Sequence, residues 1–223
     1  MASQHKNSRP LVVILALDKE GFYNDMFADF NALLKTHAIV EYATTPNEAR
    51  AFFDRSVNKP TAILSADESL TISTRLSLAH EAASYVRSGG TLVFMGLFSS
   101  FVRPTDMELL FSKFDLPWAV GDYHRTTCAL NPAMALLDTN GMASSYSQKA
   151  VHVKNVQHSN AVYLPSSESR IESAVFAPSL VGDRTQAPAA FARVGEGNVG
   201  FVGDVNNEDD TPAVVLRMCG LVL

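Results

Sequence analysis

The densest group of side chains able to do chemistry lies in residues 121–127, where Tyr123, His124 and Arg125 follow one another. An imidazole can serve as a general base, a guanidinium can hold a carboxylate or phosphate through two hydrogen bonds, and a phenol can donate a hydrogen bond. A structural network at a sheet edge, with Arg125 paired to an acidic side chain, is the alternative. We take His124 and Arg125 as candidate catalytic residues and Tyr123 as a candidate ligand contact.

A second group of polar side chains follows the predicted strands. Asp18, Asp67 and Asp204 each stand after an apolar run, and ligands of open α/β sheets bind beyond the carboxyl ends of the strands. If the three carboxylates converged, they could hold a hard cation or form an acid–base pair. Aspartates there also close turns and cap helices. We predict no metal and no cofactor, and we take Asp18 as a third candidate catalytic residue.

Further candidate ligand contacts stand at the same strand ends. Ser99 and Ser100 follow the fourth predicted strand, and the G-x-S-x-G turn of serine hydrolases is absent there. A loop or cap role is the alternative for both serines. The candidate ligand-binding residues are therefore Ser99, Ser100, Tyr123, Asp67, Asp204 and Asn206.

The other histidines and cysteines carry weaker signals. His152 and His158 flank Lys154 without a third ligand in register, so we expect them on an exposed strand and loop. Cys128 and Cys219 form neither a disulfide framework nor a zinc spacing, and we expect both to be buried small side chains. This cysteine usage favours a reducing, cytoplasmic compartment.

Alternating strands and helices must position these groups in the first half of the chain. Apolar runs predict strands at 11–17, 39–43, 61–65 and 91–96, and helical spacing predicts helices at 22–34, from 45 onward and at 73–87. Thr45, Pro46 and Glu48 form a predicted capping box. Crossovers longer than about ten residues imply parallel strands. We therefore expect an α/β three-layer sandwich with a flavodoxin-like, mostly parallel sheet.

The second half is predicted to be richer in strands. Short strands are expected at 126–130, 150–153, 161–164 and 173–177, with a short helix at 107–114. A hairpin over 189–202 closes through the glycine-rich residues 195–198, and a terminal helix over 211–221 begins with Thr211 as its N-cap. Residues 1–9 are predicted to be a disordered N-terminal tail and residues 10–223 a single domain.

Length and charge exclude several classes of protein. The 223 residues suit one α/β domain, and the net charge of −5 argues against binding to a phosphate backbone. The longest apolar run, at 11–17, is far too short to span a bilayer, and the N-terminus shows no signal peptide. We therefore expect neither a nucleic acid nor a membrane as a partner.

Three features of the chain resemble those of a known family: the order of these elements, the segment Tyr85-Val86-Arg87-Ser88-Gly89-Gly90-Thr91, and the strand pair around residues 195–204. The family they resemble is the class I glutamine amidotransferase-like superfamily, and within it the ThuA-like and uncharacterised branches. Catalytic members place a cysteine nucleophile after the fourth strand and a histidine after the last one. Here the nucleophile position falls on Gly96 or Leu97, and residues 203–208 contain no histidine. The resemblance implies this fold without glutaminase or cysteine-protease chemistry.

Three functional hypotheses follow. The leading one is a pseudoenzyme of this superfamily that binds a small molecule or a protein partner at the carboxyl ends of the strands. The second is a hydrolase or lyase in which His124 is the base, Arg125 holds an anionic substrate, and Asp18 or Asp204 orients it or binds metal. The third is a homo-oligomeric scaffold.

The bulky helix faces bear on the scaffold hypothesis. They carry Met26, Phe27, Phe30, Phe52 and Phe53. These side chains either pack on the sheet or meet a second copy, and we expect a homodimer.

Overall fold

The computed structural model describes residues 9–18 and 20–222. The predicted disordered tail lies outside these residues except for Arg9, whose guanidinium donates to the Ala38 carbonyl oxygen at 3.1 Å. The described part of the tail is therefore attached to the end of the second helix.

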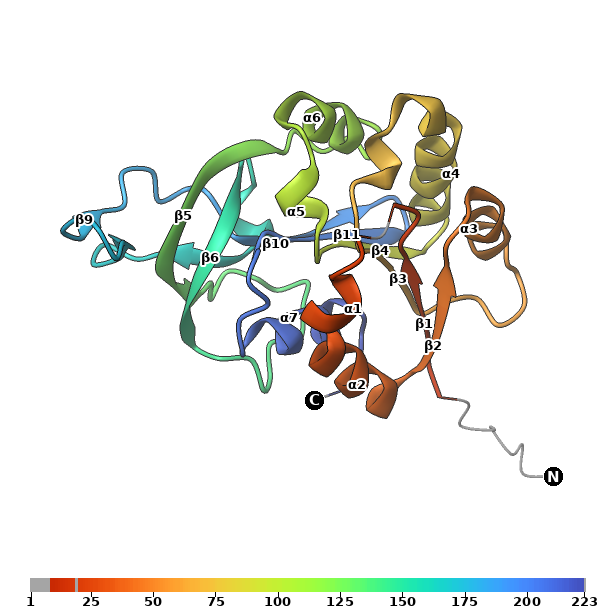
Figure 1. The fold of residues 1–223 in the computed structure, drawn as a ribbon, viewed down its shortest axis with the longest axis horizontal. Helices are drawn as coiled ribbons and strands as arrows, with labels where there is room; N and C mark the ends of the chain where they lie inside the picture. The colour runs from red at the N-terminus through yellow and green to blue at the C-terminus, as the bar shows by residue number, and fades with distance from the viewer. Residues whose placement is uncertain (1–8, 19, 223) are drawn as a thin grey trace.

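Eleven strands in the described residues form one sheet (Figure 1). Its order is β2-β1-β3-β4-β11-β10-β7-β5-β8-β9, with β6 paired to β5. The strands are β1 (Leu11–Leu15), β2 (Ile39–Ala43), β3 (Ala62–Ser65), β4 (Thr91–Phe94), β5 (Ala119–Leu130), β6 (Ser145–Lys154), β7 (Ala161–Pro165), β8 (Arg170–Glu172), β9 (Ser179–Leu180), β10 (Ala189–Val194) and β11 (Gly197–Val202).

The sheet is mixed, so the expectation of a mostly parallel sheet is wrong for its second half. The neighbours β2, β1, β3, β4 and β11 are parallel, whereas the pairs from β11 through β10, β7 and β5 to β9 are antiparallel. The hairpin between β10 and β11 closes through only Gly195 and Glu196. A two-residue turn can join antiparallel strands only.

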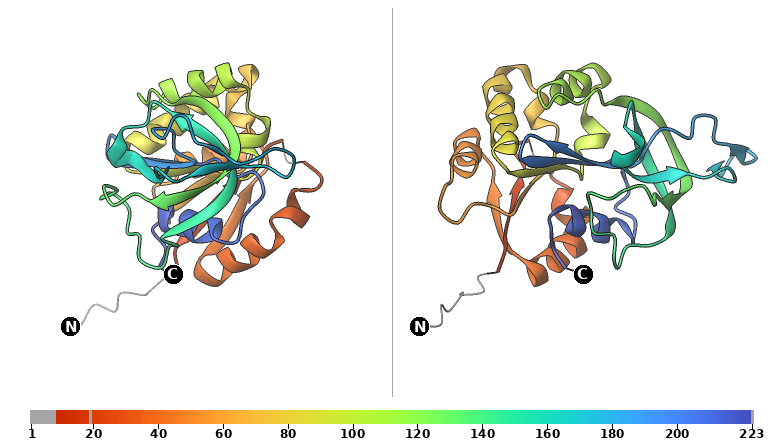
Figure 2. Two further views of the ribbon diagram at one scale, coloured as in Figure 1. Left: turned by 90° about the vertical axis from the view of Figure 1, so that its left-hand side faces the viewer. Right: turned by 180° about the vertical axis from the view of Figure 1, so that it is seen from behind.

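Helices cover both faces of the sheet (Figures 1 and 2). One core lies between the sheet and α2 and α7, and the other lies between the sheet and α3, α4 and α6. The helices are α1 (Tyr23–Met26), α2 (Ala28–His37), α3 (Pro46–Phe53), α4 (Leu76–Arg87), α5 (Phe98–Phe101), α6 (Pro104–Ser112) and α7 (Thr211–Met218), with short 3-10 turns at Ser69–Thr71, Ser73–Arg75 and His158–Asn160.

The bulky helix faces pack within the chain. Phe27, Phe30 and Phe53 are buried, while Met26 and Phe52 are partly buried against the same two cores. Most of this apolar area is therefore used by the sheet. The homodimer stays a prediction that these faces do not support.

Several local predictions are confirmed and others need correction. The capping box of Thr45 and Glu48 is present. The terminal helix, however, spans Thr211–Met218 with Asp210 rather than Thr211 as its N-cap, and the Thr211 hydroxyl donates to Asp204. Residues 173–177 are not a strand, since no neighbouring strand pairs with them.

Residues 170–186 form a projection that we call the arm. It contains β8 and β9 and extends away from the body of the molecule (Figure 1, left). Residues 172–180 are all exposed. The Ser169 hydroxyl donates to the Thr127 carbonyl oxygen at 2.6 Å, and Val181 N–H donates to the Ser169 carbonyl oxygen at 3.1 Å. The first bond attaches the base of the arm to β5, and the second ties Val181 to the residue that precedes the arm.

Candidate functional site

Strand β5 carries the candidate residues, because it begins at Ala119 rather than at residue 126 as predicted. Its register with β6 shifts between Val120 and Tyr123. Gln186 from the arm stabilises this irregularity, with its Oε1 accepting from Asp122 N–H at 2.6 Å. A β-bulge of this kind changes the direction of the side chains that follow it, here those of Tyr123 and His124.

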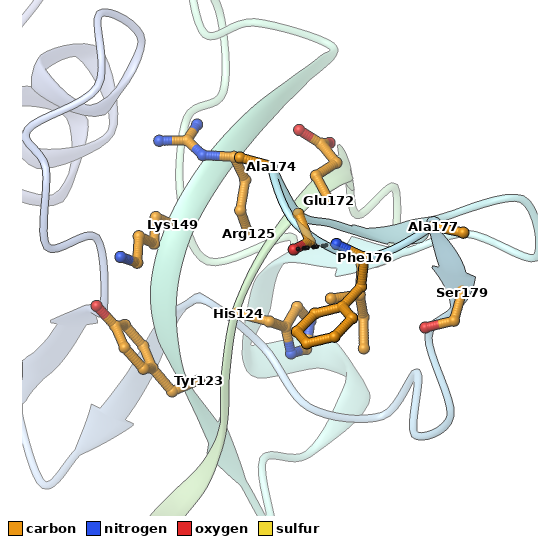
Figure 3. A pocket seen from close by; sticks show the side chains of 11 residues that line it. Tyr123, His124, Arg125, Lys149, Glu172, Ala174, Phe176, Ala177 and Ser179 are labelled. Carbon is orange, nitrogen blue, oxygen red and sulfur yellow. Dashed lines mark hydrogen bonds between the residues drawn. The ribbon is translucent and has the colours of Figure 1, made fainter.

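The candidate residues line a depression of about 840 Å³ between β5, β6 and the arm (Figure 3). Its walls are Tyr123, His124 and Arg125 of β5, Lys149 of β6, Ile171 and Glu172 of β8, and Ser173, Ala174, Phe176, Ala177 and Ser179 of the arm. Asp18 and Asp204 are absent from this lining. The structure therefore brings together three of the predicted residues and adds the arm, which sequence reasoning did not associate with a site.

Arg125 is held by an acidic partner, as the structural alternative anticipated. Its guanidinium forms an ion pair with Glu208, and a second nitrogen donates to the Ser147 hydroxyl at 3.5 Å. Glu208 belongs to the loop after β11, so this ion pair links β5 to the carboxyl ends of the parallel strands. Much of the Arg125 charge is already compensated by Glu208.

His124 stacks on His152, which the sequence reading had placed in an exposed strand. The ring centroids are 4.4 Å apart, and His152 is fully buried. Burial lowers the pKa of His124, and burial together with the neighbouring His124 lowers the pKa of His152 to about 4. Both rings are therefore neutral near pH 7. The Nε2 atoms of both rings are buried without a hydrogen-bond partner.

Lys149 is the pocket cation that sequence reasoning missed. Its ammonium lies 5.3 Å from the centre of the Tyr123 ring (Figure 3). Within the described residues it forms no ion pair with a carboxylate. Lys149 lies one register position from the His124–Ala150 pair and directly opposite Arg125. The alternation of side chains along a strand at 145–154 would have indicated the face of the sheet on which Lys149 lies. The sequence predicted only a short strand at 150–153.

Asp18 and Asp67 form a separate cluster at the ends of β1 and β3. Arg75 makes a two-nitrogen ion pair with Asp18. Asp67 accepts the backbone N–H groups of Asp18 at 2.8 Å and Ser69 at 3.1 Å. Burial raises the pKa of Asp67 despite these bonds. In this arrangement Asp67 closes a turn and Asp18 fixes Arg75.

Asp204 organises the loop after β11. It accepts N–H donors from Asn206 at 2.9 Å and Glu208 at 2.7 Å, and a hydroxyl donor from Thr211. Burial raises its pKa as well. The carboxylates of Asp18, Asp67 and Asp204 do not converge, and residues 9–18 and 20–222 contain no group of three or more His, Cys, Asp or Glu side chains arranged to hold a metal ion.

The turn after β4 contains Gly96, one of the two positions at which the resemblance would place a nucleophile. Gly96 has φ +67°, a left-handed conformation that favours glycine. A Cβ atom there would lie 3.1 Å from the Ala66 carbonyl oxygen and 3.6 Å from the Phe27 ring. The buried Ser99 hydroxyl donates to the Val202 carbonyl oxygen at 3.2 Å, while Ser100 is exposed.

Cys128 and Cys219 are free and buried, as expected, and burial raises the pKa of both thiols to about 12. Every helix of the described residues is too short or too polar to cross a membrane.

No protein-family model and no curated protein matches the chain. Its structure is similar to that of a protein described as thua-like from Bacteroides uniformis ATCC 8492, with a TM-score of 0.61, 10% identity, and coverage of 97% of this chain and 92% of that one. A second thua-like protein, from Parabacteroides merdae ATCC 43184, gives a TM-score of 0.54 at 10% identity over 96% of this chain and 89% of that one.

A beta-galactosidase from Bacillus circulans sp. alkalophilus is similar to 96% of this chain, with a TM-score of 0.56 and 11% identity. The match covers 31% of that longer chain. At such identities the likeness concerns the fold alone. The chain therefore shares its fold with these two proteins described as thua-like.

Proposed function

We propose that this chain is a small-molecule-binding protein of the amidotransferase-like class that lacks glutaminase chemistry. Its ligand occupies the depression between β5, β6 and the arm. The observation that carries the proposal is the position of Lys149, a pocket cation without a carboxylate partner in the described residues, beside the exposed ring of Tyr123. Ligand pockets combine apolar and aromatic walls with a few placed polar or charged groups.

The turn after β4 supports the second part of the proposal. Acyl transfer needs a nucleophile beside a base, and Gly96 has no side chain. The Phe27 ring and the Ala66 carbonyl oxygen border the space that a nucleophile would enter. No histidine follows β11 in residues 203–208. We therefore expect no glutamine hydrolysis.

The hydrolase or lyase hypothesis receives less support. His124 and Arg125 line the depression, but Asp18 is paired with Arg75, and Asp204 is occupied by donors of its own loop. A His124 base would therefore lack the proposed orienting carboxylates. His124 remains a candidate ligand contact, because its neutral imidazole can donate or accept a hydrogen bond.

The remaining parts of the proposal concern the class and surroundings of the protein. We place the chain in the ThuA-like branch, with its parallel half as a flavodoxin-like, three-layer unit. We also propose that it is cytoplasmic, which agrees with its two buried free cysteines.

The test is native mass spectrometry of the purified protein, compared with its denatured mass. We expect an excess mass on the folded form, or one that appears after incubation with a mixed metabolite extract. Lys149→Gln should reduce it, whereas Lys154→Gln should not, because Lys154 lies at the exposed end of the same strand and outside the depression. An unchanged mass under both conditions would overturn the proposal.

A further inference from the structure

The arm exposes apolar side chains that a ligand in the depression does not account for. Val175, Phe176 and Leu180 are 81%, 77% and 56% exposed, and of these three only Phe176 lines the depression. The arm extends away from the body of the molecule (Figures 1 and 2). Large apolar side chains that gather on one projecting element mark a contact with another molecule.

The outer edge of β9 is unpaired as well. β9 is the last strand in the sheet order, and β8 is its only strand partner within the described part of the chain. Backbone groups along such an edge can form hydrogen bonds with another strand, and charged side chains usually protect it. Residues 173–182 contain no charged side chain. Pro178, which has no N–H donor, limits the free edge to the residues that follow it.

A second copy of this chain matches this surface. The chain carries a net charge of −5, so two copies repel where their charged surfaces meet. A contact between residues 173–182 of both copies avoids that repulsion. An edge strand is also complementary to its own copy, because antiparallel pairing about a two-fold axis matches backbone donors with backbone acceptors.

The other edge of the sheet fits this role less well. That edge is β2, and it carries the charged Glu41, which is paired with Arg55. Pairing of β9 with β2 of another copy would be a head-to-tail contact, and such contacts continue into rings or open filaments. A contact between two β9 strands closes with two copies.

We propose that two copies of this chain associate through their arms about a two-fold axis, with the β9 strands paired antiparallel and Val175 and Leu180 buried between the arms. The contact is small. A standard interface takes about 800 Å² and about 25 residues from each partner, and the exposed segment 172–180 offers roughly a third of that. The dimer is therefore weak, with a Kd of about 100 µM.

Sedimentation equilibrium of the purified chain from about 5 to about 500 µM tests the association. We expect the average mass to rise from 24.2 kDa toward twice that value. A mass that stays at 24.2 kDa at the highest concentration overturns the proposal. A mass that rises beyond the dimer shows a head-to-tail contact and overturns it too.

Opposite charges at Val175 locate the contact. Val175→Glu and Val175→Lys should each weaken the dimer at least about tenfold, because both arms then carry the same charge within the contact. An equimolar mixture of the two variants should form a mixed dimer, because the charges are then opposite. Val57 is a valine of similar exposure, 73%, outside the arm, and Val57→Glu should leave the dimer unchanged. Thermal melting of each variant checks that it is folded.

The remaining outcomes decide between contact surfaces. A dimer that persists in both Val175 variants would lie elsewhere on the molecule. If the variants lose the dimer and their mixture stays monomeric, Val175 contacts a part of the partner other than its arm. Either result overturns the proposal. Because Val175 does not line the depression, Val175→Glu should keep the ligand-dependent excess mass, so the failure of the dimer is distinguishable from the failure of the proposed function.

Discussion

Gly96 is the residue that shapes the turn after β4. Its φ of +67° and the nearby Ala66 carbonyl oxygen leave little room for a side chain. We expect Gly96→Ala to reduce the free energy of unfolding by about 1–2 kcal/mol, because the left-handed conformation is costly for an L-residue. Urea denaturation would measure the loss. Gly21→Ala, where a Cβ meets nothing within 4 Å, is the control. Equal stability of the two variants would contradict the assigned turn.

His152 should make stability depend on pH. Its pKa is about 4 in the folded protein, against an ordinary value of 6.5, so the unfolded chain binds a proton more readily between these values. The stability that depends on a neutral His152 is therefore fully present above about pH 6.5. As the pH falls toward 4, the free energy of unfolding decreases by up to about 3 kcal/mol in total.

Urea denaturation of the wild type and of His152→Leu across this range would measure the contribution. The variant should show the weaker pH dependence, because its side chain cannot bind a proton. His158→Gln, at an exposed position, should keep the wild-type dependence. If His152→Leu retained the full slope, the titration would belong to other groups.

At the scale of elements, Asp204 joins β11 to α7 through three hydrogen-bond donors. Asp204→Asn places a donor group where acceptor oxygens are needed, so we expect a loss of about 2 kcal/mol in the free energy of unfolding. Asp209→Asn, exposed in the same loop, should have almost no effect. Chemical denaturation measures both. A variant with wild-type stability that lost ligand binding would instead assign Asp204 to the site.

The arm shows how strand prediction depends on a partner. Residues 173–177 carry Val175 and Phe176 among small residues, a composition that predicted a strand. In the structure the nearby pairing is limited to β8 with β5 and β9. Intervening backbone groups bond instead to the Ser173 side chain, and the apolar side chains remain exposed.

At the scale of the molecule, β11 joins the two halves of the sheet. It is parallel to β4 on one side and antiparallel to β10 on the other, and both cores contain residues from both halves. We therefore expect residues 10–222 to unfold as one cooperative unit. The single tryptophan, Trp118, is buried in the core on the α6 side.

Two optical probes test this expectation. Fluorescence of Trp118 and far-ultraviolet circular dichroism should give the same denaturation midpoint, because one reports a local core and the other all elements. Separate midpoints would divide the chain into independently folding parts. Light scattering during size-exclusion chromatography would test the predicted homodimer, which should have twice the chain mass of 24.2 kDa.

The sequence alone determined those features that arise from neighbouring residues. The buried strands β1, β3 and β4, the capping box at Thr45 and the turn at Gly195 follow from apolar runs, hydrogen bonds within one helical turn and the backbone freedom of glycine. These patterns required no knowledge of distant contacts.

Only the tertiary structure decided which polar groups meet. Arg125 and Glu208 are 83 positions apart, Asp18 and Arg75 are 57 apart, and His124 faces His152 across a strand pair. The strands predicted at 126–130 and 150–153 were too short to show these pairings. Long-range contacts depend on sheet order and register, and a shift of one residue reverses the face of every side chain. Local spacing therefore could identify the candidate residues but could not assign their partners.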